Sequence, residues 1–267
     1  MKNADCTVVV VSCDAYADVI PPFVALWHKF WPDCPFETVL LTETVLNEGF
    51  GRVISVGKCN DWAPRVLKAL SNITTPYILL VLNDYYLEAP VNTSLVLRRL
   101  EEAKRCSALN LRLVPNPPGR EPVQGSDLLE MPKNVAYCIT CQVGIWDSAF
   151  FASLLSRTRS AWEFERYGSF MIGDEQRPLL VTPTKEFPFV DAVHKGYWEK
   201  FGVEVCQRNG VPIDFAARGR PPLSVRLREG LKDLVFAVFP WTLIVRIQNL
   251  FDVGMKEQPR PKESNVI

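Results

Sequence analysis

Residues 77–86 read Tyr-Ile-Leu-Leu-Val-Leu-Asn-Asp-Tyr-Tyr, an apolar run that stops abruptly at Asn83 and Asp84. A short apolar run without polar alternation is typical of a strand buried on both faces of a parallel sheet. Residues 7–12 read Thr-Val-Val-Val-Val-Ser and are followed closely by Asp14. The sequence therefore predicts two interior strands of one parallel sheet, each ending in a polar turn.

Strand and helix patterns alternate between and around these two runs. Further strands are predicted at 36–42 and 53–56, and helices at 21–31, 62–73 and 96–106. This alternation indicates βαβ units, whose strands pair in parallel. The predicted fold class is α/β, with a Rossmann-like, mostly parallel central sheet flanked by helices.

The composition changes along the chain and predicts three parts. Residues 1–217 form one catalytic domain, whose halves are 1–115, with the βα units, and 116–217, which opens with a loop rich in Pro, Gly and charge. Residues 218–255 are basic and then apolar, and predict a C-terminal amphipathic helical tail. Residues 256–267 are predicted to be disordered.

The tail has two interpretations. Its uncharged run, 234–245, is too short to span a bilayer, which needs about 20 apolar residues. Basic and then aromatic residues over 222–251 suit a helix that lies in the membrane interface. The same pattern also suits a terminal helix packed on the core or on a second subunit.

The overall composition narrows the class of protein. The 267 residues carry 30 basic and 30 acidic side chains and are 48% hydrophobic, as is ordinary for an enzyme with a sizeable core. The zero net charge argues against nucleic acid as a partner, since phosphate neutralisation needs a basic excess. The eight cysteines come without an export signal, which favours a reducing cytosol. Cys138 and Cys141 form a CxxC without a second pair, and we expect them to be small residues at a strand edge.

The two polar turns define a candidate site. In open parallel sheets ligands bind beyond the carboxyl ends of the strands, so Asp14 and Asp84 are expected at the same edge. An aspartate directly after a buried strand is held rigidly, which suits orienting a ribose, a cation or a reacting hydroxyl. Asp14 suits a turn or a helix cap equally well. Asp84, flanked by Asn83 and two tyrosines, favours a functional role.

The usual phosphate-binding loops are missing. The chain contains neither G-x-G-x-x-G nor G-x-x-x-x-G-K-[ST], so dehydrogenase and P-loop functions lose their main support. A diphosphate would have to be neutralised by basic side chains or by a divalent cation on a carboxylate. The basic candidates are Arg65 and the turn His194-Lys195-Gly196, although each also fits a solvated surface charge.

A third feature is the segment Ala161-Trp162-Glu163-Phe164-Glu165. Aromatic residues favour burial, and burial raises the pKa of an acid drawn in with them, as a general base requires. The alternative is an amphipathic segment whose acids face water. The pattern does not decide between Glu163 and Glu165.

In their order and spacing, Ser-Cys-Asp, Leu-Asn-Asp-Tyr-Tyr-Leu and Trp-Glu-Phe-Glu resemble bacterial GT-A glycosyltransferases of capsule and lipopolysaccharide assembly, over about residues 5–215. The resemblance implies a GT-A type fold that binds a nucleotide-diphosphate sugar, such as a UDP-sugar, through its first half. It places Ser12, Asp14 and Tyr16 near the base and ribose, with Arg65 nearby. It also puts Asn83-Asp84 in the position of the family's Asp-x-Asp motif.

The sequence departs from this family at two positions. Asn83 replaces the usual first acid, and Tyr86 stands where a further acid often lies. Either Asp84 binds Mg²⁺ or Mn²⁺ with donor phosphates and waters completing the shell, or Lys195 and other cations replace the metal. The resemblance implies that Glu163 or Glu165 deprotonates the acceptor hydroxyl in a single inverting displacement.

The resulting expectation is a cytoplasmic glycosyltransferase with a glycan or lipid-linked glycan acceptor, attached peripherally through 222–251 to the inner face of the membrane. A sugar nucleotidyltransferase is disfavoured, because that chemistry normally shows a glycine-rich basic loop after the first strand. A non-catalytic partner that binds a nucleotide sugar within a membrane glycan-assembly complex remains the alternative, supported by the Asn83 departure.

Overall fold

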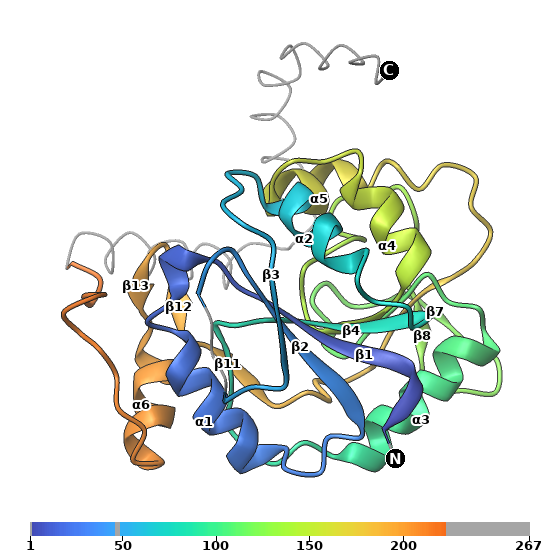
Figure 1. Ribbon diagram of the computed structural model, residues 1–267. Helices are drawn as coiled ribbons and strands as arrows, with labels where there is room; N and C mark the ends of the chain where they lie inside the picture. Colours follow the sequence, from blue (N-terminus) through green and yellow to red (C-terminus); the bar gives the residue numbers. More distant parts are fainter. Residues whose placement is uncertain (1, 46–48, 223–267) are drawn as a thin grey trace, which may run out of the picture. The chain divides into compact units, whose positions relative to one another are not determined.

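The computed structural model describes residues 2–45 and 49–222. Within them, nine strands form one sheet in the order β3-β2-β1-β4-β9-β6-β10-β8-β7 (Figure 1). Their bounds are β1 Asn3–Val11, β2 Phe36–Thr42, β3 Arg52–Ser55, β4 Tyr77–Leu82, β6 Asn110–Arg112, β7 Glu121–Pro122, β8 Leu129–Glu130, β9 Gly144–Asp147 and β10 Leu179–Val181. Seven strands run in one direction, and β8 and β9 run in the other. The predicted α/β class with a mostly parallel central sheet is confirmed.

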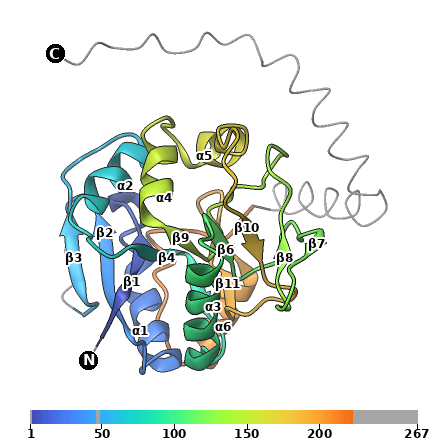
Figure 2. The same ribbon diagram turned by 90° about the vertical axis from the view of Figure 1, so that its right-hand side faces the viewer.

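Helices cover both faces of the sheet (Figures 1 and 2). On one face lie α1 (Ile20–Phe30), α3 (Thr93–Arg105) and α6 (Lys200–Arg208), and on the other lie α2 (Trp62–Leu70), α4 (Ser148–Leu155) and α5 (Ala161–Gly168). Two small two-stranded sheets accompany the large one: β5 (Tyr85–Leu87) pairs with β11 (Phe189–Asp191), and the hairpin of β12 (Val193–His194) and β13 (Tyr197–Trp198) forms the other.

The apolar side chains of β1 pack into two hydrophobic clusters, one on each face of the sheet. Val8 and Val10 pack into the hydrophobic cluster beneath α1, whereas Val9 and Val11 pack into the cluster beneath α2. Successive side chains of a strand point to opposite faces, so a strand between two helical layers needs apolar residues throughout. Each fully buried valine contributes about 1.5–3 kcal/mol relative to an exposed one. The absence of polar alternation is thus a direct result of double-sided burial.

Some predicted boundaries were wrong by a few residues because caps decide where helices begin. The third helix starts at Thr93 rather than at residue 96, since the Asn92 side chain accepts a hydrogen bond from the Leu95 backbone N–H at 3.0 Å. The predicted loop after residue 116 contains the two-residue strands β7 and β8. They pair with each other as a short hairpin, and β8 joins the sheet through a long-range pairing with β10 that leaves no local pattern. Cys138 and Cys141 are buried free cysteines in irregular chain before β9, so the expected strand edge was wrong.

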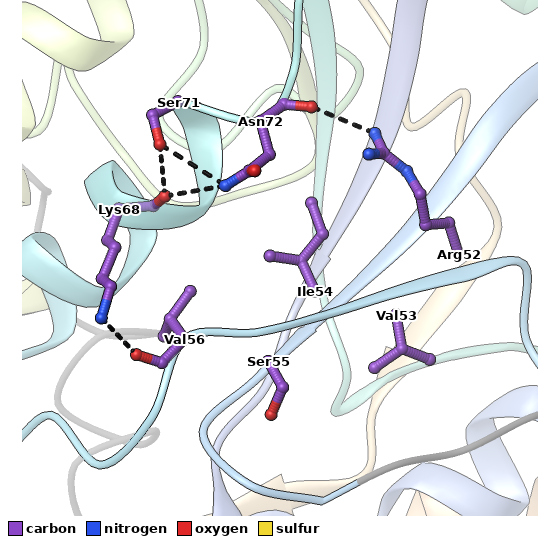
Figure 3. Close-up of a pocket in the computed structure, with 8 residues that line it drawn as sticks. All are labelled: Arg52, Val53, Ile54, Ser55, Val56, Lys68, Ser71 and Asn72. Carbon is purple, nitrogen blue, oxygen red and sulfur yellow. Dashed lines mark hydrogen bonds between the residues drawn. The ribbon is translucent and has the colours of Figure 1, made fainter.

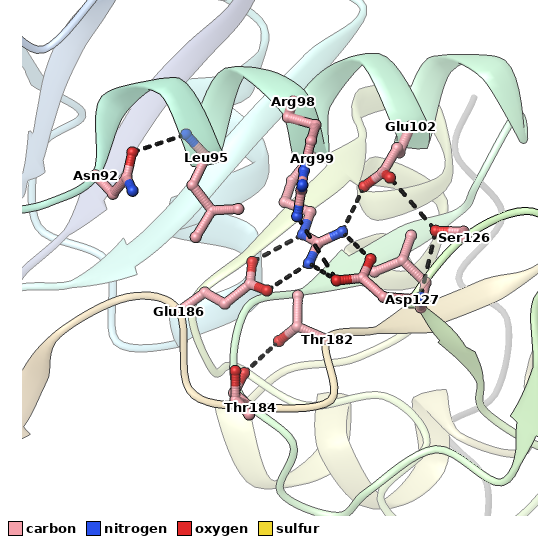
Figure 4. A network of polar contacts seen from close by, with 11 residues as sticks. Asn92, Leu95, Arg98, Arg99, Glu102, Ser126, Asp127, Thr182, Thr184 and Glu186 are labelled. Atoms are coloured by element: carbon pink, nitrogen blue, oxygen red, sulfur yellow. Dashed lines mark hydrogen bonds and ion pairs between the residues drawn. The ribbon is translucent and has the colours of Figure 1, made fainter.

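A buried arginine fixes α3 to two loops (Figure 4). The Arg99 guanidinium donates to Asp127 at 2.6 and 2.9 Å, to Glu102 at 2.7 Å and to Glu186 at 2.8 and 2.5 Å. Bidentate pairs of this kind are the strongest charge-assisted hydrogen bonds. Glu186 stands three residues before β11, so the network also sets where β11 enters the fold.

The chain divides into the compact units Met1–Gly219 and Arg220–Ile267. Residues 218–222, the start of the predicted C-terminal helices of 218–255, are irregular chain. The rest of those helices, the predicted disorder of 256–267 and all but the first residue of the predicted membrane contact of 222–251 lie beyond residue 222, outside the described residues. Among the residues that are described, no helix combines the length and apolarity needed to cross a membrane.

Candidate functional site

The carboxyl ends of β1 and β4 lie side by side, because the two strands pair in parallel with Val11 opposite Leu82. The chain goes from β1 to β2 and β3 on one side and returns to β4 on the other. Such a reversal of strand order opens a crevice at the strand ends. The segments that leave this edge begin at Ser12, whose N–H donates to Leu41 O, and at Asn83, whose N–H donates to Val11 O.

Asp14 begins a 3₁₀ turn, Asp14–Tyr16, and its carboxylate joins two loops. It accepts hydrogen bonds from the Thr44 hydroxyl at 2.5 Å, the Thr44 N–H at 2.9 Å and the Val45 N–H at 3.3 Å. The Thr44 hydroxyl is the main reason that the pKa of Asp14 is lowered. The carboxylate therefore fixes the loop after β1 to the loop after β2.

Arg65 also reaches this edge, where it is paired with an acid. Its Nη1 lies 3.3 Å from a Glu43 carboxylate oxygen, and both side chains are largely buried. Glu43 further accepts the backbone N–H of Asp14 at 3.0 Å and of Cys59 at 3.2 Å, and the Asp14 N–H is the main cause of its lowered pKa. The buried Nε of Arg65 has no hydrogen-bond partner among the described residues. An unsatisfied buried donor of this kind is available to a ligand.

Arg218, near the C-terminal end of the described residues, forms hydrogen bonds with the loop after β1. Its guanidinium donates to Asp18 at 3.0 and 3.1 Å, to Ala15 O at 2.8 Å and to Gly196 O at 3.0 Å. It also lies 4.5 Å from the centre of the Tyr16 ring, a cation–π contact. The sequence assigns Arg218 to the basic tail, because Asp18 and Ala15, which its guanidinium binds, lie about 200 residues earlier in the chain.

Asp84 directly precedes β5, at the end where β5 pairs with the last residue of β11. Its carbonyl accepts the Ala192 N–H at 2.7 Å, and Asp191 stands opposite Tyr85 in the ladder. Burial raises the pKa of Asp84 to about 7, with a further increase from the Asp191 charge and a decrease from Arg218. Burial likewise raises the pKa of Asp191. Two poorly solvated carboxylates that repel one another are typical of functional sites.

The residues beside Asp84 have different orientations. The Asn83 side-chain amide donates to Tyr16 O at 3.4 Å, which links the two turns. Tyr86 is fully buried, and its hydroxyl donates to Val19 O at 2.9 Å, so it belongs to the core. Lys195 has a φ of +49° and, with Gly196 at +83°, forms the turn of the β12–β13 hairpin. This hairpin adjoins the site, since the charge of His194 acts against the burial that raises the pKa of Asp191.

The two candidate bases on α5, Glu163 and Glu165, have different hydrogen-bond partners. Glu163 accepts the Arg159 N–H at 2.8 Å while the Ser160 hydroxyl accepts the Glu163 N–H at 3.1 Å, which caps the helix. Glu165 is half-buried and accepts the Cys141 N–H at 2.8 Å. Burial raises the pKa of Glu165, against the effects of Cys141 and of Arg112. Residues two apart differ by about 200° around a helix, so the two carboxylates cannot share a direction.

Tyr85 follows Asp84 in the chain and stands opposite Asp191 in the β5–β11 ladder. Burial raises the pKa of its phenol, and the charges of Asp84, Asp191 and Glu165 raise it further. The ladder thus brings two carboxylates from distant parts of the sequence to one tyrosine.

Arg112 supplies a positive charge beneath Glu165. It ends β6 and is almost fully buried, and it donates to Asn116 O, Tyr137 O, the Thr140 hydroxyl and Pro117 O at 3.2–3.4 Å. Burial lowers its pKa to about 10, and its Nε has no partner among the described residues. Sequence reasoning missed Arg112 and Asp191. The sequence contains a signal that could have identified Asp191, because this acid ends a short apolar run as Asp84 does. No comparable sequence signal marks Arg112.

Elsewhere, a pocket of about 450 Å³ lies between β3 and α2 (Figure 3). Arg52 and Lys68 line it, but Lys68 donates to Val56 O at 2.6 Å and Arg52 donates to Asn72 O at 3.2 Å. None of the sequence-predicted site residues lines this pocket. In the part of the chain that the structure describes, no group of three or more His, Cys, Asp or Glu side chains is arranged to hold a metal ion.

No protein-family model matches the chain, and no curated protein sequence matches it. Among solved structures, residues 1–349 of TarS from S. aureus are similar, with 13% identity, a TM-score of 0.44 and coverage of 71% of this chain. This chain spans 59% of that fragment. A cytidylyltransferase from Leptospira borgpetersenii serovar Hardjo-bovis has 12% identity and a TM-score of 0.44, over 78% of this chain and 96% of that one. The 2-C-methyl-D-erythritol 4-phosphate cytidylyltransferase of Thermus thermophilus has 12% identity and a TM-score of 0.44, over 79% and 100%. Likeness at this level carries no information on activity.

Proposed function

We propose that the protein is an inverting glycosyltransferase of GT-A type, which moves a sugar from a nucleotide-diphosphate sugar to a glycan or lipid-linked glycan in surface polysaccharide assembly. The observation that carries the proposal is that the β5–β11 pairing brings Asp191 close to Asp84 beyond the carboxyl end of β4, while Glu165 on α5 is oriented by the Cys141 N–H at 2.8 Å. Sugar transfer needs two such centres, one to hold the charged donor and one to take a proton from the acceptor.

The donor is assigned to the crevice between β1 and β4. Ser12 and Tyr16 lie on the loop that would face the base and ribose, and Asp14 holds that loop against Thr44. Arg65 pairs with Glu43, which accepts the Asp14 N–H of the same loop, and its Nε has no partner within 2–45 and 49–222. Lys195 lies in the turn of the β12–β13 hairpin, which begins two residues after Asp191. Helix N-termini and basic side chains are the usual means of binding phosphate where no glycine-rich loop exists.

Asp84 and Asp191 are suited to a divalent cation. Mg²⁺ binds in proteins through one or two carboxylates together with substrate phosphates and water, and Mn²⁺ accepts the same ligands. Burial raises the pKa of Asp84 and the charge of Asp191 raises it further, and a bound cation would favour the ionised form of both carboxylates. Such an ion would neutralise charge on the departing diphosphate. Without a metal, Lys195 and other cations would have to supply that charge.

Glu165 is assigned as the base. Its pKa is raised by burial, so the carboxylate is a better proton acceptor than an exposed glutamate. The Cys141 N–H orients one of its oxygens, and the buried charge of Arg112 keeps it ionised. The acceptor hydroxyl gives its proton to Glu165 as its oxygen bonds to the anomeric carbon and the bond to the diphosphate breaks. Glu163 takes no part, because it caps α5.

The test is a nucleotide-sugar screen with the full chain, read by thermal shift with and without Mn²⁺, followed by transfer assays on the donors that bind. A ligand that binds only the folded state raises the melting temperature. We expect Asp84→Asn and Glu165→Gln to reduce transfer about 100-fold or more. Glu163→Gln is the matched control: its amide oxygen can still accept the Arg159 N–H, so it should keep both the melting temperature and turnover. Full activity in Glu165→Gln would contradict the assignment.

One observation favours a second candidate, a non-catalytic partner that binds a nucleotide sugar. Asn83 lacks the carboxylate of the Asp-x-Asp motif, and its amide is used to link two turns. Donor binding without turnover for any acceptor would support this candidate over the transferase.

A further inference from the structure

Arg218 joins two segments of the chain that are far apart in the sequence. Its guanidinium makes a bidentate ion pair with Asp18 at 3.0 and 3.1 Å, and it donates to Ala15 O at 2.8 Å and to Gly196 O at 3.0 Å. Asp18 and Ala15 lie on the loop after β1, and Gly196 lies in the turn between β12 and β13. The planar guanidinium therefore holds the loop and the turn together, which a flexible ammonium could not do with the same geometry.

The ion pair is largely buried. The side chains of Arg218 and Asp18 expose only 8% and 11% of their surface. The main chain around the arginine is fixed as well, because Gly219 O accepts the Trp198 N–H at 3.0 Å and Asp214 O accepts the Trp198 Nε1–H at 3.2 Å. Buried charges are tolerated where they are paired and hydrogen-bonded, as here. Arg218 is thus a fixed part of the packing around the loop.

The same guanidinium also packs on Tyr16. Its central carbon lies 4.5 Å from the centre of the ring, a cation–π contact. The Tyr16 carbonyl accepts the Asn83 side-chain amide at 3.4 Å, so both Arg218 and the turn after β4 hold this residue. Tyr16 is only half-buried, which leaves part of its surface for a ligand in the crevice between β1 and β4.

We propose that Arg218 is a positioning residue for the donor, which holds the loop after β1 and the Tyr16 ring in the conformation that binds the nucleotide. This inference rests on the proposed glycosyltransferase function, which assigns the nucleotide to this crevice. Arg218 acts through the loop and does not touch the reacting atoms. A loop that is ordered in advance binds more tightly, because the free energy of ordering it is not subtracted from the free energy of binding.

Coupling of this kind is reciprocal. If the Arg218 contacts favour nucleotide binding, a bound nucleotide favours those contacts by the same factor. Amide hydrogen exchange should therefore slow at 196–198 and 214–219 when the nucleotide binds. Two amides report on these segments directly: the Trp198 N–H, bonded to Gly219 O, and the Ala216 N–H, bonded to the Asp214 carboxylate at 2.8 Å. An arginine with a purely structural role would not produce this response.

Arg218→Met tests the inference by nucleotide titration. The probes are UDP, GDP, ADP, CDP and dTDP, each titrated below the melting temperature of every variant. We expect Kd for the nucleotide that the wild type binds to rise about ten-fold, and kcat at saturating donor to stay within about two-fold, since the reacting carboxylates are unchanged. The melting temperature should also fall, because Asp18 loses its cation. Arg218→Lys should raise Kd less, because its ammonium can still pair with Asp18.

Arg177→Met is the matched control. Arg177 also pairs with two carboxylates, Asp147 and Glu175, each at 3.0 Å. Asp147 stands opposite Tyr77, at the end of β4 remote from the crevice. We expect this variant to leave the nucleotide Kd unchanged.

The outcomes separate the inference from the proposed function. If the wild-type chain binds one of the nucleotides and Arg218→Met keeps the wild-type Kd, the inference is wrong and the function stands. If Arg218→Met does not fold, hydrogen exchange of the wild type decides: exchange at 196–198 and 214–219 that does not slow on nucleotide binding overturns the inference. A wild-type chain that binds none of the nucleotides overturns the proposed function and this inference together.

Discussion

At the scale of single residues, Asp84 combines a strained electrostatic position with a rigid backbone. It follows a buried strand, its carbonyl is bound by Ala192, and Asp191 lies on the paired strand. Keeping its side chain ionised in this place costs free energy, which is why its pKa moves from 3.8 to about 7. A site that holds a poorly solvated charge exchanges stability for function.

That cost predicts a pH dependence of stability. The folded pKa of Asp84 is raised, so between pH 4 and 7 the folded protein binds more protons than the unfolded chain, and stability falls as the pH rises through this window. We expect Asp84→Asn to be more stable than the wild type at pH 8 by about 1–2 kcal/mol after allowance for solvent screening, and to lose most of this advantage at pH 4. Urea unfolding at both pH values measures the difference. Equal differences at the two pH values would show that Asp84 ionises normally.

The choice between Glu163 and Glu165 also belongs to this scale. The sequence predicts that acids lie among aromatics on one segment, but Trp162 is exposed whereas Phe164 is buried, and that difference sets the phase of the helix. The phase depends on the packing of Phe164 against Trp62 and Trp146. No local sequence pattern contains those contacts, so the sequence alone could not decide between Glu163 and Glu165 as the proposed base.

At the scale of elements, strands with apolar residues on both faces were predictable and short strands were not. The strands β1, β2 and β4 lie within two helical layers, and their composition alone identifies them. By contrast, β6 contains a buried arginine, and β11 contributes Asp191 only through its pairing with β5. The first half of the site therefore follows from the sequence, whereas the second half depends on long-range pairing.

The Arg99 network makes a prediction at the same scale. Replacing Arg99 by Leu leaves Glu102 and Glu186, both largely buried, without their cation. We expect a loss of about 3–5 kcal/mol in the free energy of unfolding, because an uncompensated buried charge is expensive. Arg98→Leu is the control: its side chain is 56% exposed and lies 3.6 Å from Asp127, so it should change stability by less than about 1 kcal/mol. Urea denaturation distinguishes the two, and equal losses would refute the role of the network.

At the scale of the whole molecule, residues 1–219 form a compact unit that contains every residue of the candidate site. The basic and apolar residues that follow are predicted to contact the membrane, where each Lys or Arg near an anionic surface contributes about 1 kcal/mol. Anchoring and chemistry would then reside in separate stretches of the chain.

Truncation after Pro222 tests that separation. We expect the shortened protein to keep its cooperative unfolding and its donor-induced thermal shift, because Arg218 and Gly219 are retained. Its sedimentation with vesicles that contain anionic lipid should fall to background. Neutral vesicles are the control for apolar binding alone. Undiminished binding to anionic vesicles would eliminate the tail as the attachment.

The contact of Arg218 with Asp18 and Ala15 has a consequence for biosynthesis. A chain emerging from the ribosome exposes the loop after β1 early, yet the guanidinium that secures this loop is translated about 200 residues later. The loop after β1 can therefore reach its final conformation only when synthesis of the compact unit is nearly complete. A nascent chain released before residue 218 would contain every proposed reactive carboxylate and still lack the guanidinium that holds this loop.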